Sequence, residues 1–284
     1  MTTIVDGGAL ARTVREEAAA QFESAVATSG VPPVVAIVQL HGAESAEMYT
    51  RQLQRAFGAA GVDVQVHELA ADASLDEATR LVRALSEDPA VHGVQIQTPL
   101  PPGLSLTACT AALDPAKDLD GIHPQNLGLL AQAQPSVVPA TPLGGLEILL
   151  RHGVDIVGAH AVVVGRSTSV GKPMALLLLQ HHATVTICHT RTRDMGSLVA
   201  QADILAVAAG RPGLVTAAMI RPGAAVVDFG TNVVDGRVVG DVDPAAADRA
   251  GLFTPVPGGT GPMTTAMLVR NALGLYRRAI GAEI

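Results

Sequence analysis

The chain has 284 residues, which is long for one compact core and sufficient for two domains of ordinary size. Hydrophobic residues make up 48% of it but aromatic residues only 2%, so the core must consist mainly of Ala, Val, Leu and Ile. The net charge of -7, without a run of Lys or Arg, leaves no electrostatic footprint for a phosphate backbone and argues against nucleic acid as a partner.

The first residues lack a charged start followed by an apolar core, and no segment is apolar enough to predict a membrane span. Cys109 and Cys188 have no Cys-x-x-Cys or His/Cys cluster nearby, which is typical of buried thiols in a reducing compartment. The adjacent His181 and His182 would face different sides of a helix, a poor geometry for metal ligands. We therefore expect a cytoplasmic protein without a metal site.

In the first half of the chain, hydrophobic periodicity predicts a helix followed by a βαβαβ unit. Such a unit requires right-handed crossovers and a mostly parallel sheet. The helices are expected at 8–29, 46–60 and 75–86, and the strands at 33–40, 62–69 and 91–97.

Two loop-rich segments follow, at 98–103 and 114–128, and long irregular loops between regular units are more often sites than decoration. The next expected element is a helix at 141–152, with Thr141 and Pro142 as its cap and first turn. Further strands are expected at 161–164, 184–189, 204–208, 225–229 and 237–239, with a last helix at about 262–279.

The segment VVVGRSTSVGKPMALLLL, residues 162–179, predicts a strand, a turn and a helix in immediate succession. Three valines form the strand, Gly165 and Gly171 bracket the turn, and the apolar run after Pro173 supplies a helix that packs on the sheet. This is the phosphate-holding half of a dinucleotide fold, although the glycine spacing departs from G-x-G-x-x-G.

The end of the next strand indicates which dinucleotide is bound. An NAD site carries an acidic residue there, whereas this chain has His189 to Arg193 with no acid before Asp194. Hydroxyl and guanidinium groups suit a 2′-phosphate, so NADP is favoured over NAD, and Arg166 in the turn could join them. The alternative is an exposed loop that carries two arginines by chance.

Four segments together resemble the bifunctional methylenetetrahydrofolate dehydrogenase/methenyltetrahydrofolate cyclohydrolase family, in order and in spacing. They are GVQIQTPLP (93–101), PAKDLDGIHPQNLG (115–128), VVVGRSTSVGKPMA (162–175) and TPVPGGTGPMTTAML (254–268). The resemblance covers nearly the whole chain. It implies a two-domain α/β homodimer with a cleft between the lobes. Residues 1–140 would form a parallel-type α/β folate-binding domain, joined by a C-terminal helix at 265–284, and residues 141–264 a Rossmann-like NADP-binding domain.

The implied activity is oxidation of 5,10-methylenetetrahydrofolate with NADP, followed by hydrolysis of the 5,10-methenyl product to 10-formyltetrahydrofolate. The resemblance assigns catalysis to Tyr49, Gln97 and Asp120, which would bind the substrate together with Pro257, Gly258 and Gly259. Read without the resemblance, Tyr49 could be a packing residue, Asp120 a turn former and Gln97 a strand end. The cofactor residues would be Gly165, Arg166, Ser167, Val170, Gly171, Thr190, Arg191 and Thr231.

One departure from the family changes the expected activity. The family helix runs Tyr-x-x-x-Lys, but the lysine position is Leu53 here, and Ala46 stands where the family usually has Ser. Hydride removal needs no proton transfer, whereas hydrolysis does, and a positioned acid or base contributes about 10²–10⁴-fold to such a step. The sequence therefore predicts a competent dehydrogenase with weak or absent cyclohydrolase activity.

Three alternatives remain open at this point. The first is a fully bifunctional enzyme with a substitute base, for which His41 could titrate usefully. The second is a folate- or nucleotide-binding protein that has become regulatory. The third is an NADP oxidoreductase acting on another small metabolite.

Overall fold

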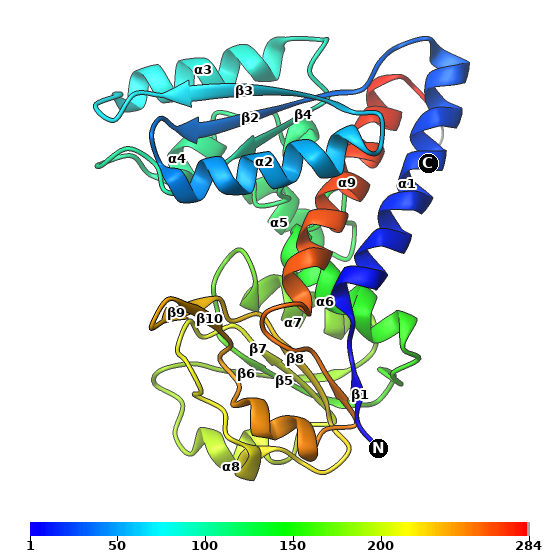
Figure 1. Ribbon diagram of the computed structural model, residues 1–284, viewed down its shortest axis with the longest axis vertical. Helices are drawn as coiled ribbons and strands as arrows, with labels where there is room; N and C mark the ends of the chain where they lie inside the picture. The colour runs from blue at the N-terminus through cyan, green and yellow to red at the C-terminus, as the bar shows by residue number, and fades with distance from the viewer. Residues whose placement is uncertain (283–284) are drawn as a thin grey trace. The chain divides into compact units, whose positions relative to one another are not determined.

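The computed structural model describes residues 1–282 and divides into two compact units (Figure 1). Unit 1 comprises Met1–Arg12 and Pro139–Met267, and unit 2 comprises Thr13–Val138 and Leu268–Ile284. Two helices, α1 (Gly7–Ser29) and α9 (Thr260–Ala279), contribute residues to both units. The last two residues of the expected 265–284 segment lie outside the described part of the chain.

Unit 2 contains a three-stranded parallel sheet in the order β3-β2-β4. Its strands are β2 (Val34–Leu40), β3 (Asp63–Leu69) and β4 (Gly93–Ile96), and its crossover helices are α2 (Glu44–Gly58) and α3 (Leu75–Glu87). The parallel βαβαβ arrangement is the one predicted from hydrophobic periodicity. The core beside it is built from aliphatic side chains of β2, β4 and α3.

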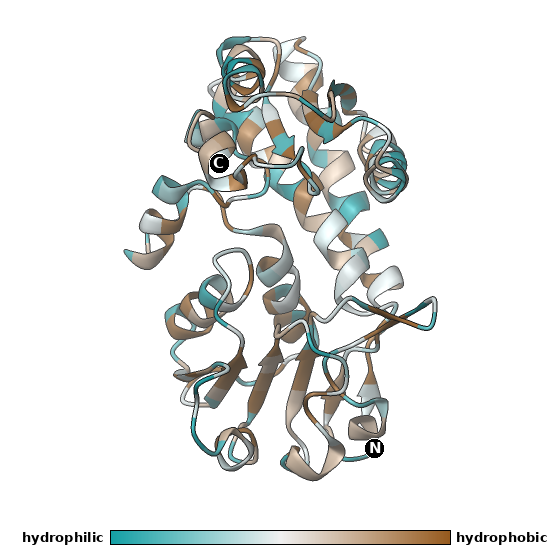
Figure 2. Cartoon of the chain, turned by 90° about the vertical axis from the view of Figure 1, so that its left-hand side faces the viewer, coloured by the Kyte–Doolittle hydropathy of each residue, from teal (hydrophilic) through white to brown (hydrophobic). Residues whose placement is uncertain are grey.

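Unit 1 contains a six-stranded sheet in the order β1-β11-β8-β7-β5-β6, with every described pairing parallel. Figure 2 shows these strands as a hydrophobic layer, as expected for strands covered on both faces. The order reverses at β5, which has β6 on one side and β7 on the other. The elements are α6 (Ala140–Arg151), β5 (His160–Val164), α7 (Gly171–Gln180), β6 (Thr184–Cys188), α8 (Met195–Val199), β7 (Ile204–Val207) and β8 (Ala225–Asp228).

Several short elements have no counterpart in the sequence prediction. The strand β1 (Thr3–Ile4) pairs with β11 (Leu252–Phe253), which places the first residues of the chain in unit 1. The hairpin strand β10 (Arg237–Val239) was expected, but its partner β9 (Asn232–Val234) was not. The remaining elements are α4 (Leu106–Thr110), η1 (Pro115–Lys117), α5 (Pro124–Ala131), η2 (Ala217–Met219) and η3 (Pro244–Asp248).

Two local predictions were wrong. Part of the 114–128 segment is helical, because α5 begins at Pro124, a residue whose fixed φ suits the first helical turn. Thr141 does not cap α6, which begins one residue earlier with Pro139 at the cap position and no side-chain cap bond. The Thr141 hydroxyl instead accepts a hydrogen bond from Thr264 at 3.3 Å.

Both cysteines are buried and free, and burial raises the pKa of each thiol, which makes the thiols unreactive. Among residues 1–282, no three His, Cys, Asp or Glu side chains form a group that could hold a metal. None of the described helices combines the length and apolar character that a membrane span needs.

Candidate active site

The turn between β5 and α7 is closely packed at two glycines. A Cβ at Gly165 would lie 2.1 Å from the carbonyl oxygen of Ala208, and the φ of this residue is +125°. A Cβ at Gly171 would lie 2.4 Å from the carbonyl oxygen of Gly165. Glycine is therefore required where β5 meets the end of β7 and where α7 meets the end of β5. This is the switch point of the parallel sheet, where α/β domains bind dinucleotides.

The other predicted cofactor residues lie in loops that follow the carboxyl ends of β5, β6 and β8. The hydroxyl of Ser167 accepts hydrogen bonds from the backbone N–H groups of Val170 and Gly171, both at 3.2 Å, and so shapes the turn. The residues concerned are Arg166, Ser167 and Val170 after β5, Thr190 and Arg191 after β6, and Thr231 after β8; all are exposed except the half-buried Val170.

Two buried aspartates brace this edge of unit 1, and the sequence analysis missed both. Asp241 accepts hydrogen bonds from the backbone N–H groups of residues 209–211 at 2.6 to 2.9 Å and from Asn232 Nδ2 at 2.8 Å. Asp228 accepts three backbone hydrogen bonds, from Gly230, Asp241 and Val242, at 2.8 to 3.1 Å. Burial raises the pKa of Asp228 to about 6, against the opposing effect of these donors. The signal in the sequence was an aspartate within two residues of a glycine in each case, Asp228 before Gly230 and Asp241 after Gly240.

The loop of Pro257, Gly258 and Gly259 is anchored within unit 1. The N–H of Gly7 donates to the carbonyl of Gly258 at 3.0 Å, and a Cβ at Gly7 would lie 1.8 Å from the carbonyl oxygen of Gly259. On the other side, the hydroxyl of Thr260 donates to the carbonyl of Asp228 at 2.8 Å. The loop is thus held between the start of α1 and the end of β8.

In unit 2, the two aspartates of the DLDG turn have different environments. Asp118 is buried and accepts from the N–H groups of Gly121 and His123 and from Asn126 Nδ2, at 2.7 to 3.0 Å. Asp118 is therefore the turn former. Asp120 accepts from Gln95 Nε2 at 3.1 Å, while burial first and Asp118 second raise the pKa of Asp120 to about 7.

Two glutamines of β4 and its carboxyl end have half-satisfied side chains. Gln95 and Gln97 are each 4% exposed, and each Nε2 donates a hydrogen bond. Within the described residues, neither Oε1 has a hydrogen-bond partner. A buried acceptor without a donor costs about 1–3 kcal/mol, so both oxygens are suited to a ligand that brings N–H or O–H groups. Their spacing of two residues places both side chains on the same face of the strand.

The helix α2 presents a mainly apolar face to the sheet of unit 2. Its buried residues are Ala46, Thr50, Leu53, Ala56 and Phe57, and Leu53 has 0% exposure. Tyr49 is half-buried on the same helix. Leu53, at the position of the expected lysine, is therefore part of the core and supplies neither charge nor hydrogen bonds.

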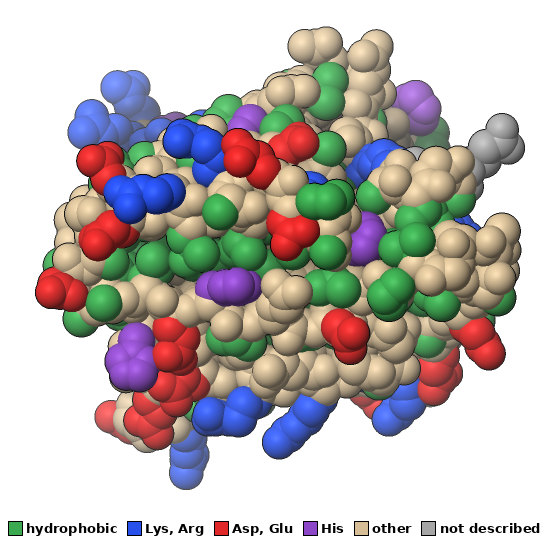
Figure 3. All heavy atoms as spheres, turned by 90° about the horizontal axis from the view of Figure 1, so that it is seen from above, with side chains coloured by type: hydrophobic (Ala, Val, Ile, Leu, Met, Phe, Trp, Pro, Cys, Tyr) green, Lys and Arg blue, Asp and Glu red, His purple; other side chains and the backbone are tan. Residues whose placement is uncertain are grey.

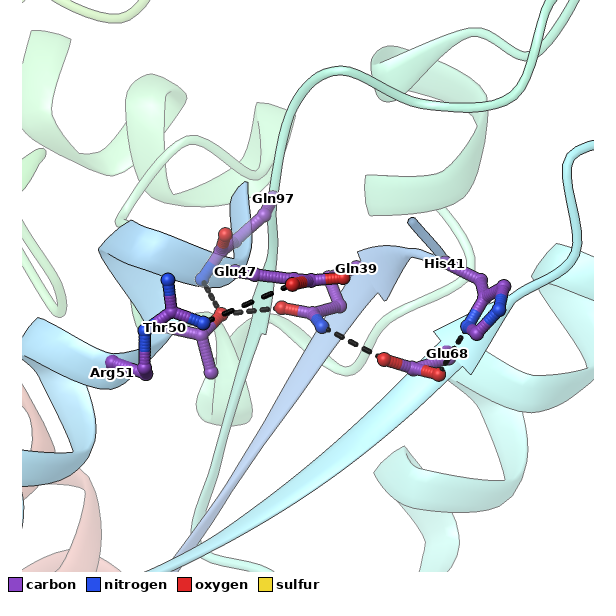
Figure 4. Close-up of polar contacts among 7 residues, drawn as sticks. All are labelled: Gln39, His41, Glu47, Thr50, Arg51, Glu68 and Gln97. Atoms are coloured by element: carbon purple, nitrogen blue, oxygen red, sulfur yellow. Dashed lines mark hydrogen bonds and ion pairs between the residues drawn. The ribbon is translucent and has the colours of Figure 1, made fainter. Parts of the chain in front are cut away.

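A row of polar side chains runs from Gln97 across this sheet (Figure 4). Gln97 Nε2 donates to Thr50 Oγ1 at 2.9 Å, and Thr50 Oγ1 donates to Gln39 Oε1 at 2.5 Å. Gln39 Nε2 then donates to Glu68 Oε1 at 3.1 Å, and Glu68 Oε2 lies 2.6 Å from His41 Nδ1.

His41 stands at the outer end of this row, with 71% of its side chain exposed. The hydrogen bond and the charge of Glu68 raise the pKa of His41 above its ordinary value. Three side chains separate His41 from Gln97, so His41 lies at the opposite end of the row from Gln97. The nearby Arg51 pairs with Glu47 at 3.8 Å on the exposed side of α2.

The parallel sheet, its switch point and the glycine turn place unit 1 in the class of Rossmann-like dinucleotide-binding domains. A family model for the catalytic domain of tetrahydrofolate dehydrogenase/cyclohydrolase matches residues 5–120, and one for its NAD(P)-binding domain matches residues 139–280. The chain belongs to the tetrahydrofolate dehydrogenase/cyclohydrolase family.

Individual relatives match this chain over nearly their whole length. "Bifunctional protein FolD" of Roseiflexus castenholzii is 53% identical over 276 residues, covering 96% of each chain. The bifunctional FolD enzyme of Campylobacter jejuni superimposes with a TM-score of 0.94 at 34% identity, covering 98% of this chain and 100% of the other. FolD of Trypanosoma brucei, solved with NADP and an inhibitor, has a TM-score of 0.93 at 35% identity, covering 99% of each chain.

Proposed function

We propose that this protein is an NADP-dependent 5,10-methylenetetrahydrofolate dehydrogenase that also hydrolyses the 5,10-methenyl product. The observation that carries the substrate assignment is the pair of unpaired amide oxygens of Gln95 and Gln97, of which Gln95 is hydrogen-bonded to Asp120. The reduced pterin ring of a tetrahydrofolate carries several N–H donors, which would complete these hydrogen bonds. The family membership of the chain supports both activities.

In this proposal, Asp120 and Gln97 bind and orient the folate, with Tyr49 beside them. The loop of Pro257, Gly258 and Gly259 shapes the substrate pocket. Gly258 has a φ of +106° and no atom within 4 Å of a Cβ placed on it, which supports a role in which backbone rather than a side chain meets the ligand.

The residues of unit 1 fit NADP. The turn after β5 leads directly into the N-terminus of α7, the kind of position that binds a pyrophosphate, and the exposed Arg166 and Arg191 supply guanidinium groups for a 2′-phosphate. When bound, NADP accepts a hydride from the methylene carbon of the folate. The remaining predicted cofactor residues, Ser167, Val170, Thr190 and Thr231, lie in the loops on the same edge of the sheet.

The two half-reactions place different demands on the protein. Removing a hydride leaves a resonance-stabilised cation, so unit 2 has only to hold the folate in place. Hydrolysis needs a water molecule to lose a proton, and Leu53 supplies no acid or base for this step. We therefore expect the cyclohydrolase rate of this protein to be well below its dehydrogenase rate.

Both activities can be measured on the purified protein by following NADPH formation from methylenetetrahydrofolate and, separately, loss of methenyltetrahydrofolate. The expected result is NADP-dependent oxidation that exceeds hydrolysis. Leu53→Lys should raise the ratio of hydrolysis to oxidation, whereas the matched control Leu53→Met should leave that ratio unchanged. Absence of NADP-dependent oxidation in the wild-type protein would refute the proposed function.

We also propose a cytoplasmic homodimer that does not bind nucleic acid. Exposed apolar side chains in unit 1, at Leu150, Leu179 and Ile187, support an interface there, with exposures of 44%, 57% and 41%. Figure 3 shows a face on which Lys and Arg are scattered among Asp and Glu, which does not suit a phosphate backbone. Free buried thiols fit a reducing compartment. Sedimentation of the wild type against Leu179→Glu tests the dimer.

A further inference from the structure

The row from Glu68 to Gln97 follows the register of the sheet in unit 2. Gln39 on the central strand β2 is the cross-strand neighbour of Glu68 on β3. On the other side, the N–H of Gln97 donates to the carbonyl of Val38 at 2.8 Å, directly beyond the last paired residues of β2 and β4. The helix α2 adds Thr50, the one polar residue on its buried face, as the bridge between the two glutamines.

The donor and acceptor inventory permits only one direction for this chain of hydrogen bonds. Ionised Glu68 can only accept, so Gln39 must present its Nε2 to Glu68 and its Oε1 to Thr50. The Thr50 hydroxyl must then donate its single proton to Gln39 and can only accept from Gln97. Gln97 must therefore point its Nε2 at Thr50, and its Oε1 away from it.

The fixed direction of these hydrogen bonds has a consequence at Gln97, the inner end of the row. Gln97 Oε1 is the buried acceptor that has no partner among residues 1–282, although the Nε2 of the same amide is bonded. Without the constraint from Thr50, the amide could turn over and offer N–H groups instead. The charge on Glu68 thus decides which atom of Gln97 faces a ligand.

We propose that Glu68, Gln39 and Thr50 are positioning residues that hold Gln97 Oε1 toward the reacting carbon, where it orients the attacking water in the hydrolytic step. The assignment rests on the proposed function. It gives this protein a polar device for hydrolysis on the buried face of α2, where Leu53 replaces the expected lysine.

The chemistry balances without a protein base. The water oxygen bonds to the methenyl carbon, and one of its two protons passes to solvent water. The remaining O–H donates a hydrogen bond to Gln97 Oε1. The bond from this carbon to N5 then breaks, N5 takes a proton and the carbinol oxygen loses one, giving the 10-formyl product and one net proton in solution. The amide oxygen orients the water but takes no proton, so the step is slower than with a base.

The first test removes the bridge. Thr50→Val keeps the shape of the side chain and deletes the hydroxyl, and we expect kcat for hydrolysis to fall about 10- to 100-fold with a smaller effect on NADP reduction. Thr50→Ser, which restores the hydroxyl, should recover most of the lost hydrolysis. The same variants should show little change in KM for methenyltetrahydrofolate, since orientation and not binding is lost.

The second test reverses the direction of the hydrogen bonds along the row by a substitution outside the core. Glu68→Lys presents donors only, so Gln39, Thr50 and Gln97 must all reverse, and Gln97 would offer an N–H that cannot accept from water. We expect a loss of hydrolysis similar to that of Thr50→Val, and no additivity in the double variant. Glu68→Gln, whose amide can still accept, should retain more hydrolysis, and Glu87→Lys, at the exposed end of α3, is the matched charge control.

Two outcomes would overturn the inference while leaving the proposed function intact. One is an active dehydrogenase in which Glu68→Lys hydrolyses as fast as Glu87→Lys. The other is an equal fall of oxidation and hydrolysis in Thr50→Val, which would indicate a general loss of structure. A wild-type protein that fails to reduce NADP with methylenetetrahydrofolate would instead refute the function on which the inference rests.

Discussion

Unit 1 and unit 2 both bury polar side chains near the carboxyl ends of their parallel strands, but they satisfy these side chains differently. In unit 1, Asp228 and Asp241 accept three and four hydrogen bonds from within the unit. In unit 2, the amides of Gln95 and Gln97 each retain an unpaired Oε1.

The difference indicates two ways of preparing a binding site. The aspartates of unit 1 use their bonding capacity to fix backbone loops, so ligand contacts there fall to glycine backbone and exposed side chains. The amides of unit 2 each have an unpaired acceptor, which in the proposed function accepts a hydrogen bond from the folate. We therefore expect substitutions of the buried aspartates of unit 1 to lower the free energy of unfolding. Substitutions of the buried polar residues of unit 2 should mainly change properties that depend on ligand binding or on ionisation.

The largest effect is expected from Asp241→Ala in unit 1. Removing this carboxylate leaves three backbone N–H groups and the Asn232 amide without their acceptor. We expect the free energy of unfolding to fall by about 3–5 kcal/mol, as measured by denaturant titration. Asp248→Ala, at an exposed position of η3, is the control and should change little. Equal free energies of unfolding for the two variants would contradict the conclusion that the buried aspartates stabilise unit 1.

An intermediate effect concerns the pH dependence of unit 2. Because burial raises the pKa of Asp120 from 3.8 to about 7, folding favours the protonated carboxyl. This contribution to stability is complete below about pH 4 and is lost as the pH rises to about 7. The expected slope is at most about 1.4 kcal/mol per pH unit.

Asp120→Asn isolates this contribution, since an amide does not titrate. The difference in free energy of unfolding between wild type and Asp120→Asn should therefore change across this pH range and become constant above it. If the free energies of unfolding of the two proteins instead follow parallel curves against pH, Asp120 has its ordinary pKa in the folded protein.

The smallest effect is expected at the exposed loops of unit 1. Arg191→Ala removes a solvent-exposed guanidinium proposed to meet the 2′-phosphate, so KM for NADP should rise about 5- to 10-fold while KM for NAD stays the same. Arg237→Ala on the β9–β10 hairpin provides the matched control. An equal rise for both cofactors would contradict the assignment to the 2′-phosphate.

Hydrophobic periodicity was sufficient for the long elements. The predicted strand at 225–229 and the helix at 75–86 differ from β8 and α3 by a single terminal residue. The two-residue strands β1 and β11 were beyond such reasoning, because each is defined by its neighbour in the sheet and is too short to show a period. The α5 helix was missed because its turn-like start, His-Pro, reads equally well as a loop.

The candidate site likewise has some features that local sequence predicts and others that depend on tertiary structure. The family and its cofactor class follow from the sequence by itself, because the residues that indicate them lie in short local segments. The same is true of the missing lysine at Leu53. The hydrogen bonds that connect Glu68 to Gln97 join residues 29, 11 and 47 positions apart in sequence, and those from residues 209–211 to Asp241 span 30 to 32 positions. Only the parallel register of the strands and the docking of α2 bring these groups together, so tertiary structure alone decided which buried polar atoms have hydrogen-bond partners and which have none.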